Sequence, residues 1–573
     1  MNPTLPRPLW QVRPRNPEAE AALADSAKIH PVTAAILISR GYDTAEKVAD
    51  FLDCDLSRLH DPSLLPDYDA GAKVIREAIA SKDLIFIHGD YDVDGVTSAA
   101  ILGRFLKSVE ANVHVHVPHR VKEGYGIHHS MVDQAAAMGT KVFLTCDCGV
   151  SAVDTIARAK RHDMKVVITD HHEPPDNLPK AEALINPHLP TSKYPYIELS
   201  GAGVAFKFCA GLARDMGFKT ENFYRGFLDL ACLGTVADMM PITGENRVIT
   251  RHGLDRIRES KKEGIQALLT VSQVVNKKLS TRDIGFKLGP RLNAAGRLED
   301  AALSLELLLT TDKARAQELA NEVDQINLRR REEQSLAVAE AIEWIKANEH
   351  HDRNALVVFN ENWHPGLVGL IAGKLVEHFY RPAFALFQTA DGYIKGSARS
   401  IPGFSIYDSI MDHMHMLMGG GGHQAAGGIT MPAANLEAFR QSLHEYAGAR
   451  LTPDDFIPKV RVDCEIEPGE IDLDVAYEIA KLEPFGQANP TPVFVARGLE
   501  LTALKKVGQE GVHTQFTFRD RAGRIHKGVT FYAEDRFDYL ALGDRLDVVF
   551  EVSIDSYQGS ETVKWFVSDV EVC

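Results

Sequence analysis

Three aspartates at alternate positions are the residues best placed to do chemistry in this sequence. Asp90, Asp92 and Asp94 precede Gly95 and follow the apolar run 84–87, which is typical of a short buried strand. The carboxylates would therefore lie just past the carboxyl end of that strand. Three carboxylates this close repel one another, and a divalent cation is the usual counter-charge. The segment predicts a metal site, with an aspartate-rich surface turn as the alternative interpretation.

Further carboxylates and imidazoles follow other apolar runs, at Asp147, Asp170, His171, His172 and Asp238. The whole set offers enough ligands for two metal ions. Carboxylates with one or two imidazoles favour Mn²⁺ or Mg²⁺ over Zn²⁺. Two such ions about 4 Å apart can lower the pKa of a bridging water, orient a phosphate and neutralise a leaving oxygen. Two-metal aminopeptidases use similar ligands, so a phosphate-binding site must decide between the two chemistries.

The aspartate segment also matches the opening of an EF-hand calcium loop. The twelfth position of that loop requires a bidentate glutamate, and here it is Ile101. An EF-hand loop also follows a helix, whereas this segment follows a predicted strand. We therefore exclude calcium.

The glycine-rich segment 419–428 is the best candidate for an anion site. Backbone N–H groups in such a segment can approach an anion, and His423 can add a donor. The glycines alone fit a tight turn or a flexible linker equally well. Ser397 and Arg399 lie in the same region and combine a hydroxyl with a guanidinium, which suits phosphate. Arg399 therefore favours an anion site.

Alternating strands and helices must position these residues. Strand-like apolar runs occupy 84–87, 113–117, 142–145, 165–169 and 183–185. This rhythm predicts a doubly wound, mostly parallel sheet, and such sheets bind ligands outside the carboxyl ends of their strands. The polar residues that follow the strands would then converge.

The next elements are less regular. The segment 230–238 is predicted to be an apolar helix or strand that delivers Asp238, and 252–275 is predicted to be helical. The segment 289–297 carries two arginines and is predicted to be rich in turns. No glycine or proline occurs between Gly296 and Pro365, which predicts a long helix joining two domains. Its charged run is most simply a solvated face.

The C-terminal half predicts two more units. A second α/β unit spans about 354–449, with strands expected at 355–359, 383–387 and 392–398. Beyond residue 458, many short strands predict an OB-like β-barrel. These strands are expected at 493–496, 514–518, 529–532, 546–552 and 563–567.

Composition and charge set wide limits. A chain of 573 residues is too long for one core, and 45% hydrophobic with 25% charged residues is ordinary for a globular protein. The net charge of −16 does not exclude a nucleic-acid partner, because basic residues can gather along one groove. The seven cysteines form no Cys-x-x-Cys pair. No apolar segment resembles a signal peptide or a membrane span, so we expect a cytoplasmic protein without a membrane partner.

Two common catalytic motifs are missing. There is no Walker A sequence, because Gly373-Lys374 is followed by Leu375 and position 368 is valine. There is also no Gly-x-Ser-x-Gly sequence, so covalent acyl chemistry has no support.

Several motifs together resemble the DHH phosphoesterase superfamily. They are Asp90-Tyr-Asp-Val-Asp-Gly, Asp147-Cys-Gly, Asp170-His-His and Gly234-Thr-Val-Ala-Asp, with Gly421-Gly-His as the signature of an associated second domain. The segments 289–297 and 482–490, with the terminal barrel, are similar to those of the RecJ family within that superfamily, whose members are exonucleases for single-stranded DNA. The resemblance runs from about residue 70 to the C-terminus.

The resemblance implies a multidomain α/β protein with a barrel. Its parts are an N-terminal extension (1–70), a DHH metal-binding catalytic domain (71–300), a long connecting helix (301–350), a DHH-associated phosphate- and substrate-binding domain (351–450) and an OB-fold nucleic-acid-binding domain (455–573).

The implied activity is a two-metal (Mn²⁺ or Mg²⁺) exonuclease that hydrolyses single-stranded DNA from the 5′ end to 5′-mononucleotides, in DNA repair and recombination. The implied partners are single-stranded DNA, a single-strand DNA-binding protein and a helicase, and the chain is expected to be a monomer.

The resemblance also assigns roles to residues. The implied metal ligands are Asp92, Asp94, Asp147 (bridging), His171 and Asp238, completed by either Asp90 or His88. His172 would lie beside the scissile phosphate and act with Asp94 and Asp147, while Arg399 and His423 clamp the phosphate. The implied phosphate-binding residues are Arg120, Arg297, Ser397, Arg399, Gly421, Gly422 and His423.

One segment departs from the expected family pattern. Where we expect His-Leu-Lys in the barrel, this chain has His513-Thr-Gln, and Lys505, Lys506, Arg519 or Lys527 would have to replace the lysine. The alternatives to the implied function are a DHH phosphodiesterase acting on short oligonucleotides or cyclic dinucleotides, a non-catalytic replication scaffold and, more remotely, a metallopeptidase.

Overall fold

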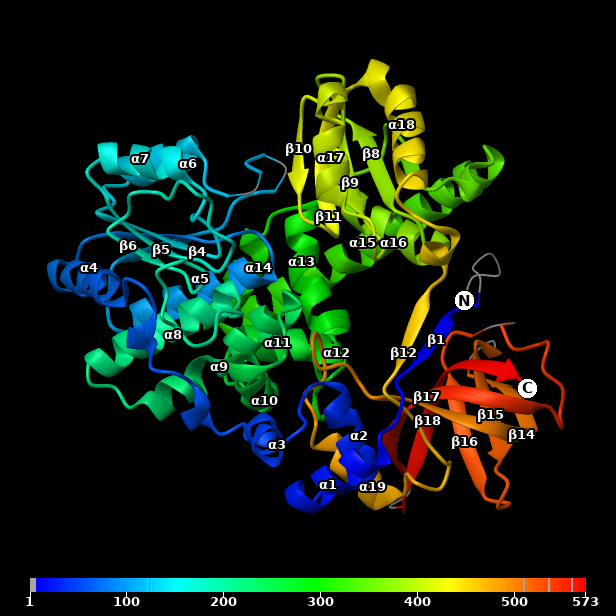
Figure 1. Ribbon diagram of the computed structural model, residues 1–573. Coiled ribbons are helices and arrows are strands. Elements are labelled where there is room, and N and C mark those ends of the chain that lie inside the picture. The colour runs from blue at the N-terminus through cyan, green and yellow to red at the C-terminus, as the bar shows by residue number, and fades with distance from the viewer. Residues whose placement is uncertain (1–6, 121, 125, 509–510, 534–535, 558–559) are drawn as a thin grey trace.

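The computed structural model describes residues 7–573 except 121, 125, 509–510, 534–535 and 558–559. In Figure 1, an α/β unit with its helices lies on the left and a second α/β unit lies at the top right. A β-barrel in orange and red lies below the second unit, beside the N-terminal helices in blue.

The first sheet is parallel throughout, as predicted. Its strand order is β3-β2-β4-β5-β6, and every neighbouring pair is parallel. The strands are β2 (Ile85–His88), β3 (Val113–His116), β4 (Val142–Cys146), β5 (Lys165–Thr169) and β6 (Ala183–Ile185). β2, β4 and β6 are fully buried, because helices cover both faces of the sheet.

Two layers of helices cover this sheet. One core joins Phe86 and Phe143 to α6 (His129–Ala137) and α7 (Val153–Arg161). The other face packs on α4 (Tyr68–Ser81), α5 (Val93–Ser108) and α8 (Gly201–Asp215). α9 (Thr220–Ala237) packs in turn against α5 and α8. The open prediction for 230–238 is thereby resolved as a helix.

The segments beyond α9 differ from two predictions. The expected helix at 252–275 is divided into α10 (Gly244–Arg258) and α11 (Glu263–Val271). The expected turns at 289–297 are wrong, because α12 (Thr281–Asp283), a π-helical turn η3 (Ile284–Leu288) and α13 (Gly289–Leu298) follow one another. A proline in the first turn of a helix loses no hydrogen bond, so Pro290 is compatible with α13. The short α14 (Ala302–Leu309) follows.

The predicted long helix is α15 (Lys313–Ala347), about 52 Å long. Its Asp312 cap accepts a hydrogen bond from the backbone N–H of Arg315. Leu319 and Val323 lie in the core of the first unit, whereas Ala341 and Ile345 lie in a core of the second. One helix therefore anchors both units.

The second unit has a mixed sheet in the order β10-β11-β9-β8-β7. Only β7 and β8 are parallel. The strands are β7 (Leu356–Phe359), β8 (Ala383–Gln388), β9 (Tyr393–Arg399), β10 (Gly419–Gly422) and β11 (Ala426–Pro432), and the helices are α16 (Val368–Phe379), α17 (Ile406–Asp412) and α18 (Leu436–Gly448). Much of the glycine-rich segment is therefore a strand hairpin.

The C-terminal strands form a closed barrel, as predicted. The order is β13-β14-β15-β16-β18-β17, and pairing between β14 and β17 closes it. The strands are β13 (Cys464–Glu465), β14 (Val493–Val507), β15 (His513–Arg519), β16 (Ile525–Thr530), β17 (Arg545–Tyr557) and β18 (Ser560–Val572). The strand expected at 529–532 lies earlier in the chain, because β16 begins at Ile525 and ends at Thr530.

The N-terminal segment packs on the barrel. β1 (Leu9–Val12) pairs with β12 (Lys459–Val462). The helices α1 (Pro17–Ala27), α2 (Pro31–Ser39), α3 (Ala45–Leu52) and α19 (Leu473–Ala480) share one core with the barrel. In the described part of the chain, no single helix is long and apolar enough to cross a membrane. The pair α1 and α2 reaches that length and hydropathy only together, and it bends by 107° at its break.

Candidate metal centre

The aspartate segment forms the turn from β2 into α5. Asp92 caps α5, its Oδ1 accepting a hydrogen bond from the backbone N–H of Gly95 at 3.1 Å. Asp94 lies in the first turn of the helix. Glycine is required at position 95, because a Cβ there would approach the backbone oxygen of Asp90 to 2.4 Å. The tight turn therefore brings all three aspartates to the same edge of the sheet.

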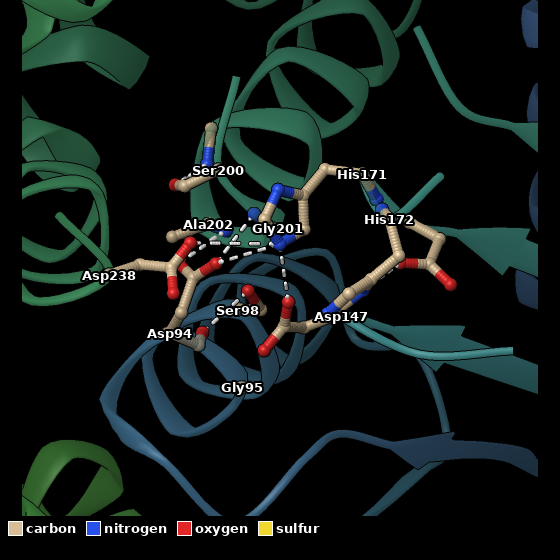
Figure 2. Close-up of polar contacts among 12 residues, drawn as sticks. Asp94, Gly95, Ser98, Asp147, His171, His172, Ser200, Gly201, Ala202 and Asp238 are labelled. Carbon is tan, nitrogen blue, oxygen red and sulfur yellow. Dashed lines mark hydrogen bonds and ion pairs between the residues drawn. The ribbon is translucent and has the colours of Figure 1, made fainter. Parts of the chain in front are cut away.

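Asp94 is held by the beginning of a second helix. Its Oδ2 accepts from the N–H of Gly201 at 2.6 Å, and its Oδ1 accepts from the N–H of Ala202 at 2.9 Å, both in the first turn of α8 (Figure 2). These bonds favour the charged carboxylate. Burial and the charge of Asp92 outweigh them and raise the pKa of Asp94 to about 6.

Asp147 lies at the centre of the cluster. It follows β4 in a left-handed conformation with φ +58°, and its backbone N–H donates to Thr169. Asp147 Oδ1 lies 3.1 Å from His171 Nε2 but has no partner with hydrogen-bond geometry among the described residues. Burial, followed by the charges of Asp94 and Asp92, raises the pKa of Asp147 well above its ordinary value.

His171 lies among three carboxylates (Figure 2). Its Nε2 is 3.1 Å from Asp147 Oδ1 and 3.7 Å from both Asp94 Oδ2 and Asp238 Oδ2. Burial, followed by the charge of His172, lowers the pKa of His171 to about 4. A neutral imidazole is the form that coordinates metals.

Asp170 orients His172. Its Oδ1 accepts from His172 Nδ1 at 2.8 Å and from the backbone N–H of His171 at 2.8 Å, and its Oδ2 accepts from the N–H of Val150. Burial opposes the charged imidazolium of His172, but the hydrogen bond and charge of Asp170 raise its pKa to about 9. Asp170 therefore supports the site as a buried, fully bonded carboxylate.

Three groups of ligand atoms lie within 4.8 Å of one another: Asp94 with His171 and Asp238, Asp147 with His171 and His172, and Asp90 with Asp92 and Asp147. Asp147 and His171 are shared, so the groups adjoin. Burial and neighbouring carboxylates raise the pKa of both Asp90 and Asp238 to about 8. The buried Oδ1 of Asp90 has no hydrogen-bond partner in the described structure. Crowded carboxylates with unmatched oxygens and a neutral imidazole fit two divalent cations.

His88 belongs to none of these groups of described residues. Its Nε2 lies 3.3 Å from the Gly126 carbonyl oxygen, and its Nδ1 lies 3.3 Å from His116 Nδ1. Burial lowers the pKa of His88 to about 3. Of the two competitors for one coordination position, Asp90 is the one near the other ligands.

Arginines from both α/β units lie across from this centre. Arg120 covers the Tyr91 ring at 3.9 Å and donates to the Gly296 carbonyl. Arg297 is partly buried, and burial, followed by the charges of Arg120, Arg330 and Arg399, lowers its pKa to about 10. A partly buried arginine with other guanidiniums close by is matched by a polyanion.

Arg399 lies at the end of β9 and donates to Ser397 Oγ at 3.0 Å. Ser397, Gly421, Tyr91 and Arg120 line one cavity of about 1160 Å³ between the two units. The structure thus brings together most of the residues expected to bind phosphate. His423 is exposed at the tip of the β10–β11 hairpin, and its side chain contacts none of these described arginines.

Two residues that support the site were not predicted from the sequence. Ser200 caps α8, whose first N–H groups bind Asp94. Asn293 of α13 accepts from the N–H of Val93 at 3.2 Å and so fixes the start of α5. A serine followed by a glycine-rich apolar run is a readable helix start, but the contact of Asn293 joins segments 200 residues apart and leaves no local signal.

Comparison with known proteins agrees with these parts. Family models match residues 84–235 (DHH family, N-terminal domain), 352–449 (DHHA1 domain) and 462–569 (RecJ OB domain). The chain is 35% identical to the single-stranded-DNA-specific exonuclease RecJ of Bacillus subtilis (strain 168), over 98% of this chain and 71% of the relative. It is 34% identical to the protein of that name from Escherichia coli (strain K12), over 84% of this chain and 86% of the relative.

Solved structures agree as well. The crystal structure of RecJ with Mn²⁺ from Thermus thermophilus has a TM-score of 0.83 at 29% identity and covers 99% of this chain and 80% of that one. The Mg²⁺ complex of RecJ from the same organism has a TM-score of 0.77 at 28% identity, covering 99% and 78%. Both ions are those expected from the ligand types in the sequence.

Proposed function

The chain belongs to the RecJ family of single-stranded-DNA-specific exonucleases, and on that premise we propose that it hydrolyses single-stranded DNA from the 5′ end and releases 5′-mononucleotides. The observation that carries this proposal is the pairing of a two-cation ligand set with a wall of nearby arginines, Arg120, Arg297 and Arg399, of which Arg120 and Arg399 are close enough to Arg297 to lower its pKa. A metallopeptidase would have no use for that wall.

The ligands of the two cations would be Asp90, Asp92, Asp94, Asp147, His171 and Asp238. When bound, Mn²⁺ or Mg²⁺ supplies a polarised water and neutralises charge on the reacting phosphate. The protein contributes the rigid placement of the ligands, through the first turns of α5 and α8 and the end of α9. That placement removes the entropic cost of assembling the reacting groups.

His172 would act as a proton donor beside the scissile phosphate. Asp170 binds its Nδ1, so Nε2 is the atom that would donate to a phosphate oxygen. With a pKa of about 9, the imidazolium is populated at neutral pH. It would stabilise the negative charge that develops during hydrolysis.

The polarity would come from recognition of a terminal phosphate. Such a phosphate carries roughly −1.5 to −2 charges at neutral pH, more than an internal phosphodiester. Arg120, Arg297 and Arg399 would bind it together with Ser397, and Gly421 and Gly422 would offer backbone N–H groups, with His423 closing from the hairpin tip. These roles are supported by the cavity that Arg120, Ser397 and Gly421 line, by the hydrogen bond from Arg399 to Ser397, and by the charges of Arg120 and Arg399 that act on Arg297.

The larger setting is proposed from the family alone. We infer a catalytic unit (71–300), a connecting helix (301–350), a phosphate-binding unit (351–450) and a strand-guiding barrel (455–573). We also infer a cytoplasmic monomer that acts in DNA repair and recombination with a single-strand DNA-binding protein and a helicase.

Strands labelled at one end test the proposal. With Mn²⁺, a 5′ label should be released at once as a mononucleotide, whereas a 3′ label should stay on shortening strands until late. Asp147→Asn should release neither label, and chelation of Mn²⁺ should stop the reaction. Release of the 3′ label first would overturn the polarity, and short oligonucleotide products would overturn the mononucleotide product.

A further inference from the structure

A second cavity, of about 340 Å³, lies between the barrel and the helices of the first unit. Three parts of the chain line it: α10 together with residues 278–282, the loop residues 483–486 and 490–491, and residues of β17 and β18. Thr281 Oγ1 donates to the Phe485 carbonyl at 2.5 Å, which ties the loop to α12. In Figure 1 this junction lies where the orange loop before β14 reaches α12. The cavity is of the size and position typical of ligand sites at domain interfaces.

Its walls are largely apolar, with Leu254, Phe485, Pro490 and Phe566 among the lining residues. Arg251 and Arg282 also line it, and both are at least partly exposed. Lys278 is paired with Glu483 at 2.8 Å. Two accessible guanidiniums around an apolar interior match a ligand with a flat apolar body and a phosphate.

Glu551 is the exceptional group in this cavity. It lies on β17 directly opposite Phe566 of β18, so both side chains share the outer face of the barrel. Its carboxylate has no hydrogen bond and no ion pair within 4 Å to any residue that the structure describes. Burial raises the pKa of Glu551, and the charge of Arg282 only partly offsets that effect. Because Glu551 lines the cavity, its two carboxylate oxygens can accept hydrogen bonds from a molecule bound there.

A row of aromatic rings leads away from this cavity over the barrel. Phe566 lies 5.7 Å from Phe531, Phe531 lies 5.0 Å from His513, and His513 lies 5.1 Å from Tyr532, measured between ring centroids. Phe531 is 51% exposed and Tyr532 is 82% exposed. Exposed aromatic rings are the surface on which successive bases of a single strand stack, and Phe531 and Tyr532 provide two of them. The cavity lies at one end of this row.

We propose that this cavity binds a guanine base of the single strand, with Glu551 accepting hydrogen bonds from its N1–H and 2-amino groups. The inference rests on the proposed function, because the single strand bound here is the substrate of the proposed exonuclease. Guanine offers two adjacent N–H donors, which match the two oxygens of one carboxylate. Phe485 and Phe566 would contact the base, and Arg251 and Arg282 would bind the flanking phosphates.

The other bases fit this pocket less well. Adenine and cytosine each place one amino group beside a ring acceptor, which would face the second carboxylate oxygen. Thymine has one N–H between two carbonyls, and both carbonyls would be repelled. Glu551 therefore makes binding depend on base identity, which backbone contacts and stacking alone do not.

A binding scan tests this inference. The probes are oligothymidylates of about twenty nucleotides with a single dG at successive positions and a 3′ fluorophore, measured by anisotropy in EDTA so that no strand is cut. At one position, dG should tighten binding by roughly tenfold, the usual size of a bidentate base contact. Inosine at that position lacks the 2-amino group and should recover only part of the gain.

Matched variants locate the effect. Glu551→Gln should abolish the dG preference, whereas Glu571→Gln, at an exposed glutamate of the same β-sheet, should keep it. A scan without any preferred position, or a preference that survives in Glu551→Gln, would overturn the proposal. Digestion of plain oligothymidylate with Mn²⁺ tests the exonuclease separately. The unmodified protein should digest it whether or not a dG preference exists, so the two conclusions can fail independently.

Discussion

At the scale of single residues, the metal centre is a cluster of carboxylates that cannot all be charged without cations. Asp90 and Asp238 have pKa values raised to about 8, and the pKa of Asp147 is also raised well above its ordinary value. Burial is the first cause in each case, and neighbouring aspartates add to it. The fold therefore stores repulsion at this site, and bound cations relieve it.

This repulsion predicts a pH-dependent stability of the metal-free protein. Carboxyls with raised pKa stabilise the fold below their ordinary value of 3.8, and this contribution is lost as the pH rises to about 8. His172, with its pKa raised to about 9, also makes the fold less stable as the pH rises above about 6.5. The lowered pKa of His171 makes the fold more stable as the pH rises, but only below about pH 6.5.

In EDTA, the thermal unfolding midpoint should therefore fall between about pH 6.5 and pH 8, and Mn²⁺ should raise it more at the higher pH. Differential scanning calorimetry measures both. Asp90→Asn should flatten the fall. A midpoint that is constant or rises over this range in EDTA would contradict the assigned repulsion.

The pair Asp170 and His172 predicts a shift in the pH dependence of catalysis. Asp170→Asn removes the charge that holds the proton on His172, so its pKa should return towards its ordinary value of about 6.5. The alkaline limb of the kcat profile should move from near pH 9 towards that value. Asp133→Asn, at a carboxylate of α6 that is paired with Arg158, is the control and should leave the limb in place. An unchanged limb in Asp170→Asn would exclude His172 as the proton donor.

At the scale of elements, the sequence predicted the parallel sheet because its strands are short, apolar and followed by polar residues. It predicted α15 because no glycine or proline interrupts it. It failed at 289–297, where glycine and proline were interpreted as turns. Gly296 instead allows α13 to approach the metal turn, since a Cβ there would lie 2.7 Å from the Tyr91 carbonyl oxygen.

The barrel strands show a second limit of the sequence. β14 and β17 are longer than their apolar runs, because both strands continue beyond those runs through segments rich in polar residues. Tyr532 was assigned to a strand, but its φ of +52° is incompatible with one. The clustering of the aspartates was predictable from the order of the strands. The pairing of Asp94 with the start of α8 was not, because it depends on tertiary packing.

Two glycines of α9 give a matched test of close packing. A Cβ at Gly234 would lie 2.5 Å from both Asp94 Oδ1 and Thr97 Oγ1, whereas a Cβ at Gly226 would meet nothing within 4 Å. Helix propensity favours alanine at both positions by about 0.5–1 kcal/mol. Gly226→Ala should therefore stabilise the protein, and Gly234→Ala should destabilise it by about 1–3 kcal/mol and lower Mn²⁺ affinity.

Urea unfolding and Mn²⁺ titration measure these effects. If Gly234→Ala matched Gly226→Ala in stability and metal affinity, the close approach of α9 to Asp94 would be wrong.

At the scale of the whole molecule, a chain with a net charge of −16 is proposed to bind a polyanion. The acidic residues at the metal centre account for part of this charge, while beside it the charges of Arg120, Arg330 and Arg399 act on Arg297. The electrostatic field that acts on a bound strand is therefore set by the nearby arginines and not by the net charge of the chain. α15 lies in the cores of both units, so it fixes the distance between the metal ligands and Arg399.

The metal ligands lie in the first unit and Arg399 lies in the second. This arrangement predicts how the end of a strand is recognised. If Arg399 binds the terminal phosphate, strands with a 5′-phosphate should have a higher kcat/KM than strands with a 5′-hydroxyl. A charged hydrogen bond contributes about 1.5–3 kcal/mol, so Arg399→Ala should reduce that advantage roughly 10- to 100-fold. Arg450→Ala, at an exposed arginine of the same unit that covers Tyr446, should leave it unchanged. An equal loss on both substrates would place Arg399 on an internal phosphate, and 5′ polarity would then require another source.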